Sequence, residues 1–186
     1  YKQKAKKLNT LLKNQKKSIY IDDALFELGR TELILGREDE ALSFYNQLIN
    51  AYPNSNYLAG TYLKTGLIHY NRKADDLALT SFDAVIKRYP GSNEAKQALG
   101  KIKKIYIEKG DASAFQDYMN GVPFADISKN ELDSTTYVIA ENAYLEGKCE
   151  KAVRDFTNYI KRYKDGLFSL NAHYYRADCE LKAEFY

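Results

Sequence analysis

Several residues that usually mark catalytic sites or irregular structure are scarce in this sequence. Its 186 residues include no tryptophan, one methionine, two cysteines, two histidines and three prolines. Three prolines and ten glycines leave little room for long irregular segments. No run approaches the roughly 18 apolar residues of a membrane-spanning helix, and a net charge of +3 is too small to indicate nucleic acid binding by itself. The hydrophobic share of 45% indicates a folded rather than a disordered chain.

The few histidines and cysteines form no pattern typical of a metal site or a catalytic pair. His69 and His173 lie far apart, and neither has Cys, Asp or Glu at ligand spacing on its own helix face. Cys179 follows His173 by six residues, which places the two side chains roughly 240° apart around a helix. The sequence also lacks a glycine-rich nucleotide loop and a serine nucleophile elbow. We therefore expect no enzyme activity, no cofactor and no bound metal, and a packing role for His69.

The N-terminal segment is basic and carries no recognisable address signal. The chain starts without methionine or a signal peptide, and seven lysines lie between Lys2 and Lys17, before any acidic residue. These lysines are interpreted either as a solvated helix face or as a patch that binds a polyanion. Because the repeats described below are also cut at both ends, we expect a fragment of a longer protein. Its cellular location and oligomeric state stay unknown at this point.

Tyrosine is abundant, and similar residues recur at intervals of 37 positions. The 17 tyrosines, against 8 phenylalanines, suit half-buried sites where the ring packs and the hydroxyl meets water. A fixed period in this range is typical of a solenoid, in which each unit covers the apolar face of the next. The recurring sets are Gly36, Lys73, Gly110 and Gly147; Ala41, Ala78 and Ala152; Tyr45, Phe82 and Phe156; and Tyr52 with Pro53 and Tyr89 with Pro90, followed two periods later by Tyr163.

Within each period the apolar residues follow helical spacing. Leu25, Gly29 and Leu33 lie at i, i+4 and i+8 on one helix stripe. A second stripe follows a turn at Gly36, and Pro53 ends it. Each period therefore predicts an antiparallel helical hairpin, and the whole chain predicts an all-α solenoid of about ten helices.

We expect residues 1–186 to form one solenoid segment with one irregular unit. In the third unit Gly121 and Pro123 interrupt the second helix early, so this unit is interpreted as degenerate. The expected divisions are the second helix of a truncated repeat at 1–19, repeats at 20–55 and 56–92, the degenerate repeat at 93–130 with a loop over 121–130, a repeat at 131–166, and the first helix of a truncated repeat at 167–186.

These patterns resemble the tetratricopeptide repeat, whose hairpins carry a small residue in the first helix, a glycine turn, an alanine with an aromatic residue four positions later, and a closing proline. The third unit departs from this pattern, since it has Lys103 at the small position and Phe115 at the alanine position. The resemblance implies a right-handed superhelix that mediates protein interaction. The matching residues are Gly29, Gly36, Ala41, Tyr45 and Pro53 in one unit, Gly66, Ala78, Phe82 and Pro90 in the next, and Ala140, Gly147, Ala152 and Phe156 in the fourth.

The period of 37 and the Tyr-Pro-x-Ser endings are similar to those of cell-envelope tetratricopeptide proteins of Gram-negative bacteria. That likeness implies a bacterial protein of the periplasm or one associated with the outer membrane. Cys149 and Cys179 would lie close together in a stacked array. They are interpreted either as a disulfide, which would fit an oxidising compartment, or as two small buried thiols.

By the same resemblance, the first helices line a concave groove that binds a peptide or protein partner. The alternative for each ring in this row is packing between adjacent first helices. Two other functions stay open: a structural spacer or self-associating segment of an envelope assembly, and RNA binding, which the period and the mixed charge disfavour. The expected groove residues are Phe26, Arg30, Leu63, Leu67, Tyr70, Lys104, Glu108, Tyr137, Glu141, Tyr144, Tyr174 and Asp178.

Overall fold

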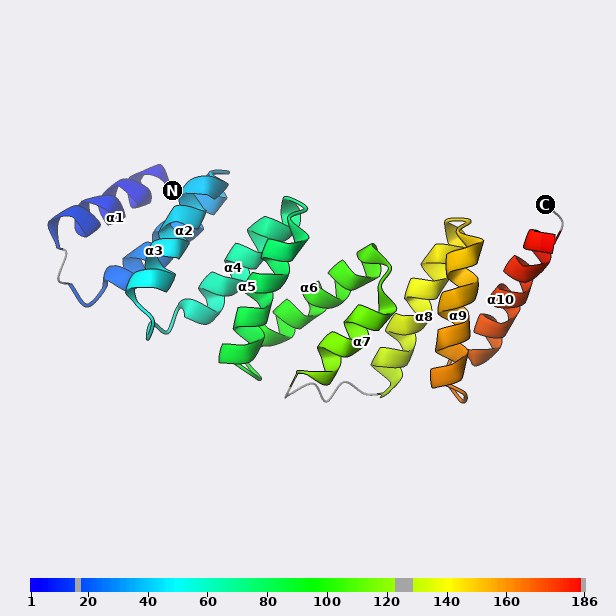
Figure 1. The fold of residues 1–186 in the computed structure, drawn as a ribbon. Coiled ribbons are helices and arrows are strands. Elements are labelled where there is room, and N and C mark those ends of the chain that lie inside the picture. The colour runs from blue at the N-terminus through cyan, green and yellow to red at the C-terminus, as the bar shows by residue number, and fades with distance from the viewer. Residues whose placement is uncertain (16–17, 123–128, 185–186) are drawn as a thin grey trace. The chain divides into compact units, whose positions relative to one another are not determined.

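The computed structural model describes residues 1–15, 18–122 and 129–184, and these residues form ten α-helices and no strand (Figure 1). The expected all-α repeat fold is confirmed. The chain divides into two compact units, unit 1 (Tyr1–Leu99) and unit 2 (Gly100–Tyr186), and each is described by itself. The helices are α1 (Lys2–Asn14), α2 (Ile21–Ile34), α3 (Glu38–Ala51), α4 (Leu58–Asn71), α5 (Asp75–Arg88), α6 (Asn93–Lys109), α7 (Ala112–Asn120), α8 (Lys129–Leu145), α9 (Cys149–Arg162) and α10 (Ser169–Glu184).

The turn inside each hairpin has one repeated backbone form. At the first turn the N–H of Gly36 donates to the carbonyl of Leu33 at 3.0 Å, and the N–H of Arg37 donates to that of Glu32 at 2.8 Å. This pair of bonds ends a helix with a residue in the left-handed conformation, which suits glycine. The same pair recurs at the three other turns. The left-handed residues are Gly36, Lys73, Gly110 and Gly147, with φ of 74°, 58°, 66° and 72°.

Each hairpin of unit 1 closes around one aromatic ring. A Cβ atom on Gly29 would lie 2.2 Å from the ring of Tyr45, and one on Gly66 would lie 2.5 Å from the ring of Phe82. Both rings are fully buried. The absent side chain therefore makes the space that the ring fills, because protein interiors are close-packed.

Polar contacts also fasten the hairpins of unit 1 to one another. The Ser55 hydroxyl after α3 donates to a carboxylate oxygen of Asp22 in α2 at 2.7 Å. Arg72, at the end of α4, pairs with Glu38 at 2.8 Å and with Asp39 at 2.9 Å at the start of α3. These contacts fix the register of one hairpin against the next.

Unit 2 contains a shortened second helix. α7 has 9 residues, whereas α3, α5 and α9 each have 14. Of the loop expected at 121–130, residues 123–128 lie outside the described residues. Residues 129 and 130 are helical instead, because α8 begins at Lys129.

A buried hydrogen-bond cluster joins α8, α9 and the segment before α10 in unit 2. The hydroxyl of Tyr159 donates to the Asp133 carboxylate, whose second oxygen accepts the N–H of Leu167 at 2.8 Å. The N–H of Phe168 donates to the same tyrosine oxygen at 3.2 Å. Tyr159 is fully buried and Asp133 is 4% exposed. The cluster therefore holds the start of α10 against the preceding hairpin.

Among the described residues, no helix combines the length and the apolar character needed to cross a membrane.

Candidate functional site

In unit 1 the expected groove residues differ widely in exposure. Arg30 is exposed and Leu67 is half-buried. Leu63 and Tyr70 are only 7% and 8% exposed, so both contribute to the core and offer a partner little surface. Phe26 is half-buried, and its ring stacks on that of Tyr57 with centroids 4.9 Å apart. The prediction that Leu63 and Tyr70 line an open groove is therefore corrected.

A small cluster of charged side chains surrounds Arg30, the exposed groove residue of unit 1. Glu27 accepts hydrogen bonds from Lys4 of α1 and, at 2.6 Å, from Arg30. Burial would raise the pKa of Glu27, but the bonds from these two cations outweigh it and lower the pKa. Burial, with a smaller contribution from Arg30, lowers the pKa of Lys64. The surface here presents a cation, Arg30, beside a half-buried lysine.

In unit 2 two of the expected groove tyrosines are structural. Tyr137 is 3% exposed and stacks on Phe168 with ring centroids 4.4 Å apart. Tyr144 of α8 packs on Tyr175 of α10 at 4.5 Å, so its ring lies between adjacent first helices. This is the packing role that the sequence left open as the alternative, and for Tyr137 the groove prediction is wrong.

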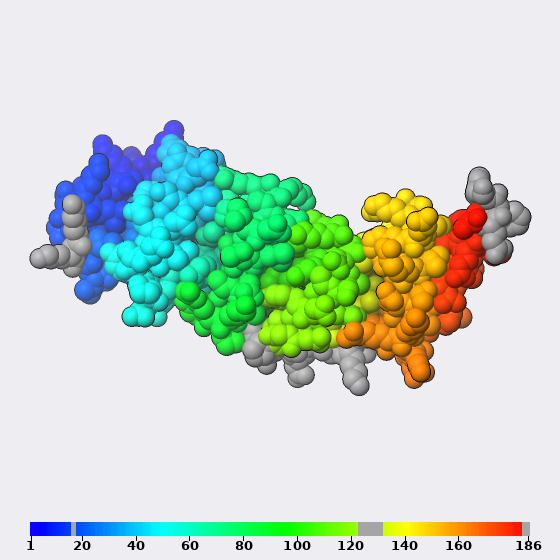
Figure 2. Space-filling model, viewed as in Figure 1, coloured from blue at the N-terminus to red at the C-terminus, as the bar shows by residue number. Residues whose placement is uncertain are grey.

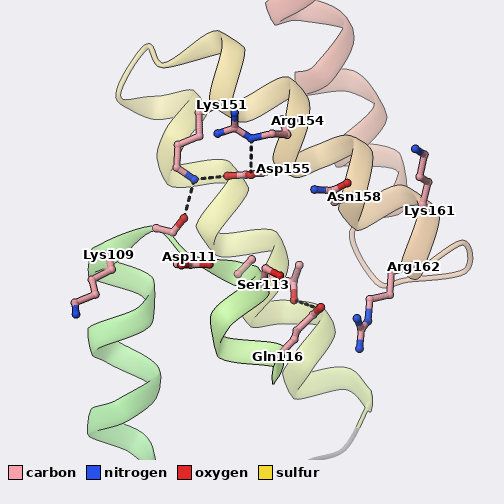
Figure 3. A pocket seen from close by; sticks show the side chains of 13 residues that line it. Lys109, Asp111, Ser113, Gln116, Lys151, Arg154, Asp155, Asn158, Lys161 and Arg162 are labelled. Carbon is pink, nitrogen blue, oxygen red and sulfur yellow. Dashed lines mark hydrogen bonds and ion pairs between the residues drawn. The ribbon is translucent and has the colours of Figure 1, made fainter. Parts of the chain in front are cut away.

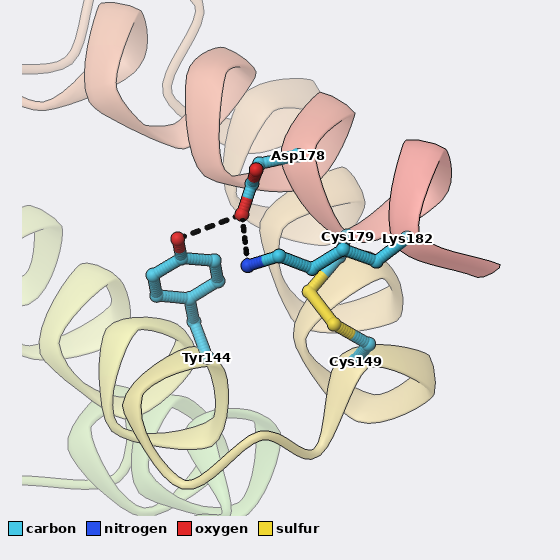
Figure 4. Close-up of a disulfide and its surroundings, with 5 residues drawn as sticks. All are labelled: Tyr144, Cys149, Asp178, Cys179 and Lys182. Carbon is cyan, nitrogen blue, oxygen red and sulfur yellow. Dashed lines mark hydrogen bonds and ion pairs between the residues drawn. A yellow bond between two sulfur atoms is a disulfide. The ribbon is translucent and has the colours of Figure 1, made fainter. Parts of the chain in front are cut away.

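The hydroxyl of Tyr144 also ties α8 to α10. It donates to Asp178 at 2.7 Å, and Lys182 binds the same carboxylate (Figure 4). The bond to Asp178, followed by burial, raises the pKa of Tyr144. The bonds from Lys182 and Tyr144 lower the pKa of Asp178. Asp178 is therefore held within unit 2 rather than left for a partner.

The remaining groove residues of unit 2 keep more surface. Tyr174 is 66% exposed. Lys104 and Glu108 are exposed and lie 3.9 Å apart in an ion pair one helical turn apart. Glu141 is half-buried and accepts the Tyr137 hydroxyl at 2.8 Å. A partner on this face would meet Tyr174 and a mixed pair of charges.

The two cysteines are joined in the structure. Cys149, the first residue of α9, forms a disulfide with Cys179 of α10, and their Cα atoms lie 5.2 Å apart (Figure 4). Cys179 is fully buried. The bond fastens the last described helix to the hairpin before it.

Each unit contains a hollow beside second helices that was not expected from the sequence. The first, the α7–α9 hollow, has a volume of about 820 Å³ and is lined by residues of the α6–α7 turn, α7, α8 and α9 (Figure 3). The second, the α1–α3 hollow of unit 1, has the same volume and is lined by α1, α2, α3 and Tyr52. Figure 2 shows α7 and α9 on one face of unit 2.

The polar residues of α9 are the only indication of the α7–α9 hollow in the sequence, and they are a weak one. Lys151, Arg154, Asn158, Lys161 and Arg162 line it from α9. At 100° per residue these five positions fall within an arc of about 100°. In the sequence alone, such a polar stripe is indistinguishable from an ordinary solvated helix face.

The histidines do not form a site. His69 is half-buried, and burial followed by the nearby Arg72 charge lowers its pKa. In the part of the chain that the structure describes, no three His, Cys, Asp or Glu side chains come together as a metal site would require.

Comparison with known proteins agrees with this geometry. Residues 23–55 and 61–92 match the family model of the tetratricopeptide repeat. These two segments are similar to tetratricopeptide repeats. Both matched segments lie in unit 1, where the pairs of glycine and aromatic ring are best formed.

A solved structure shares the fold. A tetratricopeptide repeat protein from Parabacteroides merdae ATCC 43184 aligns with a TM-score of 0.58 and 13% identity over 95% of this chain. The chain spans 64% of that protein's length. At this identity the likeness shows the fold alone. No curated protein matches the sequence.

Proposed function

We propose that this chain is a non-catalytic scaffold that binds a peptide or protein partner on the exposed part of its first-helix face. Tetratricopeptide repeats generally mediate protein–protein interaction, and the family is typically non-catalytic. The observation that carries the proposal is the exposure of Tyr174, a large ring that is 66% exposed on a first helix. A ring with an apolar body and a polar tip is the kind of residue that anchors interfaces. In unit 1 Arg30 and Leu67 offer the corresponding contacts.

Site-specific photo-crosslinking tests this proposal. A photoreactive phenylalanine derivative would replace Leu67 or Tyr174 in the full-length protein in its own cells. Leu77, which is 55% exposed on the second helix α5, provides the matched control position. Adducts with the same other protein from both first-helix positions, and none from Leu77, are expected. Adducts only between copies of this chain would instead support the self-associating or spacer function.

We also propose that the protein works in an oxidising compartment, such as the periplasm or the outer-membrane surface. The disulfide between Cys149 and Cys179 supports this, because disulfides persist mainly outside the cytosol. Alkylation of free thiols in protein taken directly from its cells tests the point. Two labelled cysteines in the native protein would contradict it.

A further inference from the structure

The α7–α9 hollow of unit 2 lies between the start of the short helix α7 and the longer helix α9. α7 has 9 residues, whereas α9 beside it has 14, so α9 extends past the end of α7. Gln116 of α7 is fixed from within, since its side-chain nitrogen donates to Thr136 at 2.9 Å and to Tyr163 at 3.0 Å. A polar side chain that two hydrogen bonds hold in place therefore forms part of the wall of the hollow.

The charges around this hollow are mostly positive. Lys109, Lys151, Arg154, Lys161 and Arg162 line it, together with two carboxylates, Asp111 and Asp155 (Figure 3).

Both carboxylates are already engaged. Asp111 accepts the N–H of Ala114 at 2.9 Å and caps α7. Asp155 is bound by Lys151 and lies 3.9 Å from Arg154. Lys161 and Arg162 make no ion pair with any residue in the described ranges. The hollow thus has positive charge that the protein itself does not neutralise.

The length of the cationic row indicates the form of the ligand. Lys151 and Arg162 are eleven residues apart on α9, which is about 16 Å along the helix axis. A single phosphate group is much shorter than this, whereas about five residues of extended peptide span it. Arginine and carboxylate pair well, because the guanidinium fork matches two carboxylate oxygens.

The lining disfavours single-stranded nucleic acid. Proteins that hold single strands stack bases on aromatic side chains. Among the described residues that line the hollow there is no aromatic ring, and two carboxylates stand at it. The charge attracts anions, but the described part of the lining offers no aromatic platform for bases.

We propose that the α7–α9 hollow binds an acidic segment, rich in Asp and Glu, of a protein partner. The inference rests on the proposed scaffold function and adds a second contact site on the opposite helices of the hairpins. Arg154, Lys161 and Arg162 bind the carboxylates, and Asn158 donates a hydrogen bond between them. Binding is electrostatic and weakens as salt rises.

Fluorescence anisotropy with a labelled hexaglutamate peptide tests the site on the full chain. A hexaglutamine peptide, inorganic tripolyphosphate and a short single-stranded oligonucleotide serve as comparison ligands. The double variant Lys161→Glu with Arg162→Glu removes two exposed cations of the hollow. The matched control is Lys2→Glu with Lys13→Glu on α1, which makes the same change in net charge at two exposed positions.

Hexaglutamate should bind the natural chain saturably, and hexaglutamine should not. The hollow variant should weaken hexaglutamate binding about tenfold or more, and the α1 control by less than about twofold. Equal losses in the two variants, no saturable binding, or tighter binding of tripolyphosphate or the oligonucleotide would each overturn the proposal. Crosslinks from Leu67 and Tyr174 report on the first-helix face independently. They would persist if only the hollow proposal failed.

Discussion

The α1–α3 hollow of unit 1 and the α7–α9 hollow of unit 2 occupy the same place in the repeat but differ in chemistry. Five of their lining positions correspond across 111 residues, which is three periods. Both hollows measure about 820 Å³, yet α3 lines one with Asp39 and otherwise neutral residues, whereas α9 lines the other mainly with cations. The repeat therefore sets where a hollow forms, and the exposed positions set what it attracts. The corresponding pairs are Ser43 with Arg154, Gln47 with Asn158, Asn50 with Lys161, and Ala51 with Arg162.

The difference between the units continues into the core. Leu25 and Leu48 of unit 1 correspond to Thr136 and Tyr159 of unit 2, so apolar contacts are replaced by hydrogen-bonded ones. Unit 2 also carries the disulfide, whereas unit 1 contains no cysteine. Unit 2 thus depends on polar and covalent links at places where unit 1 depends on packing.

The largest expected effect comes from removing the covalent link. Replacing Cys149 and Cys179 by alanine should destabilise unit 2 by about 3 kcal/mol, because the bond closes a loop of 30 residues in the unfolded chain. Urea unfolding followed by hydrogen exchange would locate the loss. Dithiothreitol should have the same effect on the natural chain. Equal weakening of α2–α5 in unit 1 would contradict this contrast between the units.

The second comparison uses two aspartates at corresponding positions. Asp133→Ala leaves the buried Tyr159 hydroxyl and the Leu167 N–H without their acceptor, which should cost about 3 kcal/mol. Asp22→Ala loses the bond from Ser55 at a half-buried site, which should cost about 1 kcal/mol. Denaturant unfolding of both variants measures the difference. Equal losses would show that the Asp133 cluster adds nothing beyond the ordinary contact.

A third comparison concerns two buried tyrosine hydroxyls. That of Tyr45 has no hydrogen-bond partner among the described residues, whereas that of Tyr159 binds Asp133. Tyr45→Phe should therefore stabilise the chain by about 1 kcal/mol, as Phe82 and Phe156 at the corresponding positions suggest. Tyr159→Phe should destabilise it by about 1 kcal/mol. Thermal unfolding measures both, and changes of the same sign would refute the distinction.

The pH dependence of stability provides a second test of Tyr45 and Tyr159. Burial raises the pKa of Tyr45, and burial with the bond to Asp133 raises that of Tyr159. Both hydroxyls stay neutral in the folded chain at a pH where tyrosines of the unfolded chain ionise. Stability should therefore fall as the pH rises above about 10. Each phenylalanine variant should make that fall shallower, which denaturant midpoints at alkaline pH would show.

The hairpins could be predicted from the sequence because their determinants are local and repeated. A glycine opposite a ring has the same steric role in both hairpins of unit 1, at Gly29 with Tyr45 and at Gly66 with Phe82. The exposure of single positions could not be predicted in this way. Tyr137 became buried because Phe168, from outside its own hairpin, covers its ring.

The α7–α9 hollow could not be predicted for a related reason. It requires side chains that four separate segments bring together in space. The pattern at Gly121 and Pro123 does indicate that the second helix ends early. It says nothing of which side chains of α9 line the hollow.

The smallest expected effect tests the one turn that departs from glycine. Lys73 is the single non-glycine residue with positive φ in the described ranges, and its ammonium lies 5.5 Å from the centre of the Tyr70 ring. A side chain in this conformation costs about 1–2 kcal/mol. Glycine regains part of that but loses more entropy on folding, so Lys73→Gly should stabilise unit 1 by about 0.5–1 kcal/mol.

Gly147→Ala in unit 2 is the reverse change at a corresponding turn. A Cβ atom there meets nothing within 4 Å, so the substitution isolates the backbone cost, and a loss of about 1 kcal/mol is expected. Thermal unfolding of the two variants compares the turns directly. If Lys73→Gly were destabilising, the contact between Lys73 and Tyr70 would outweigh the backbone strain, and the second turn would depart from the others in energy as well as in sequence.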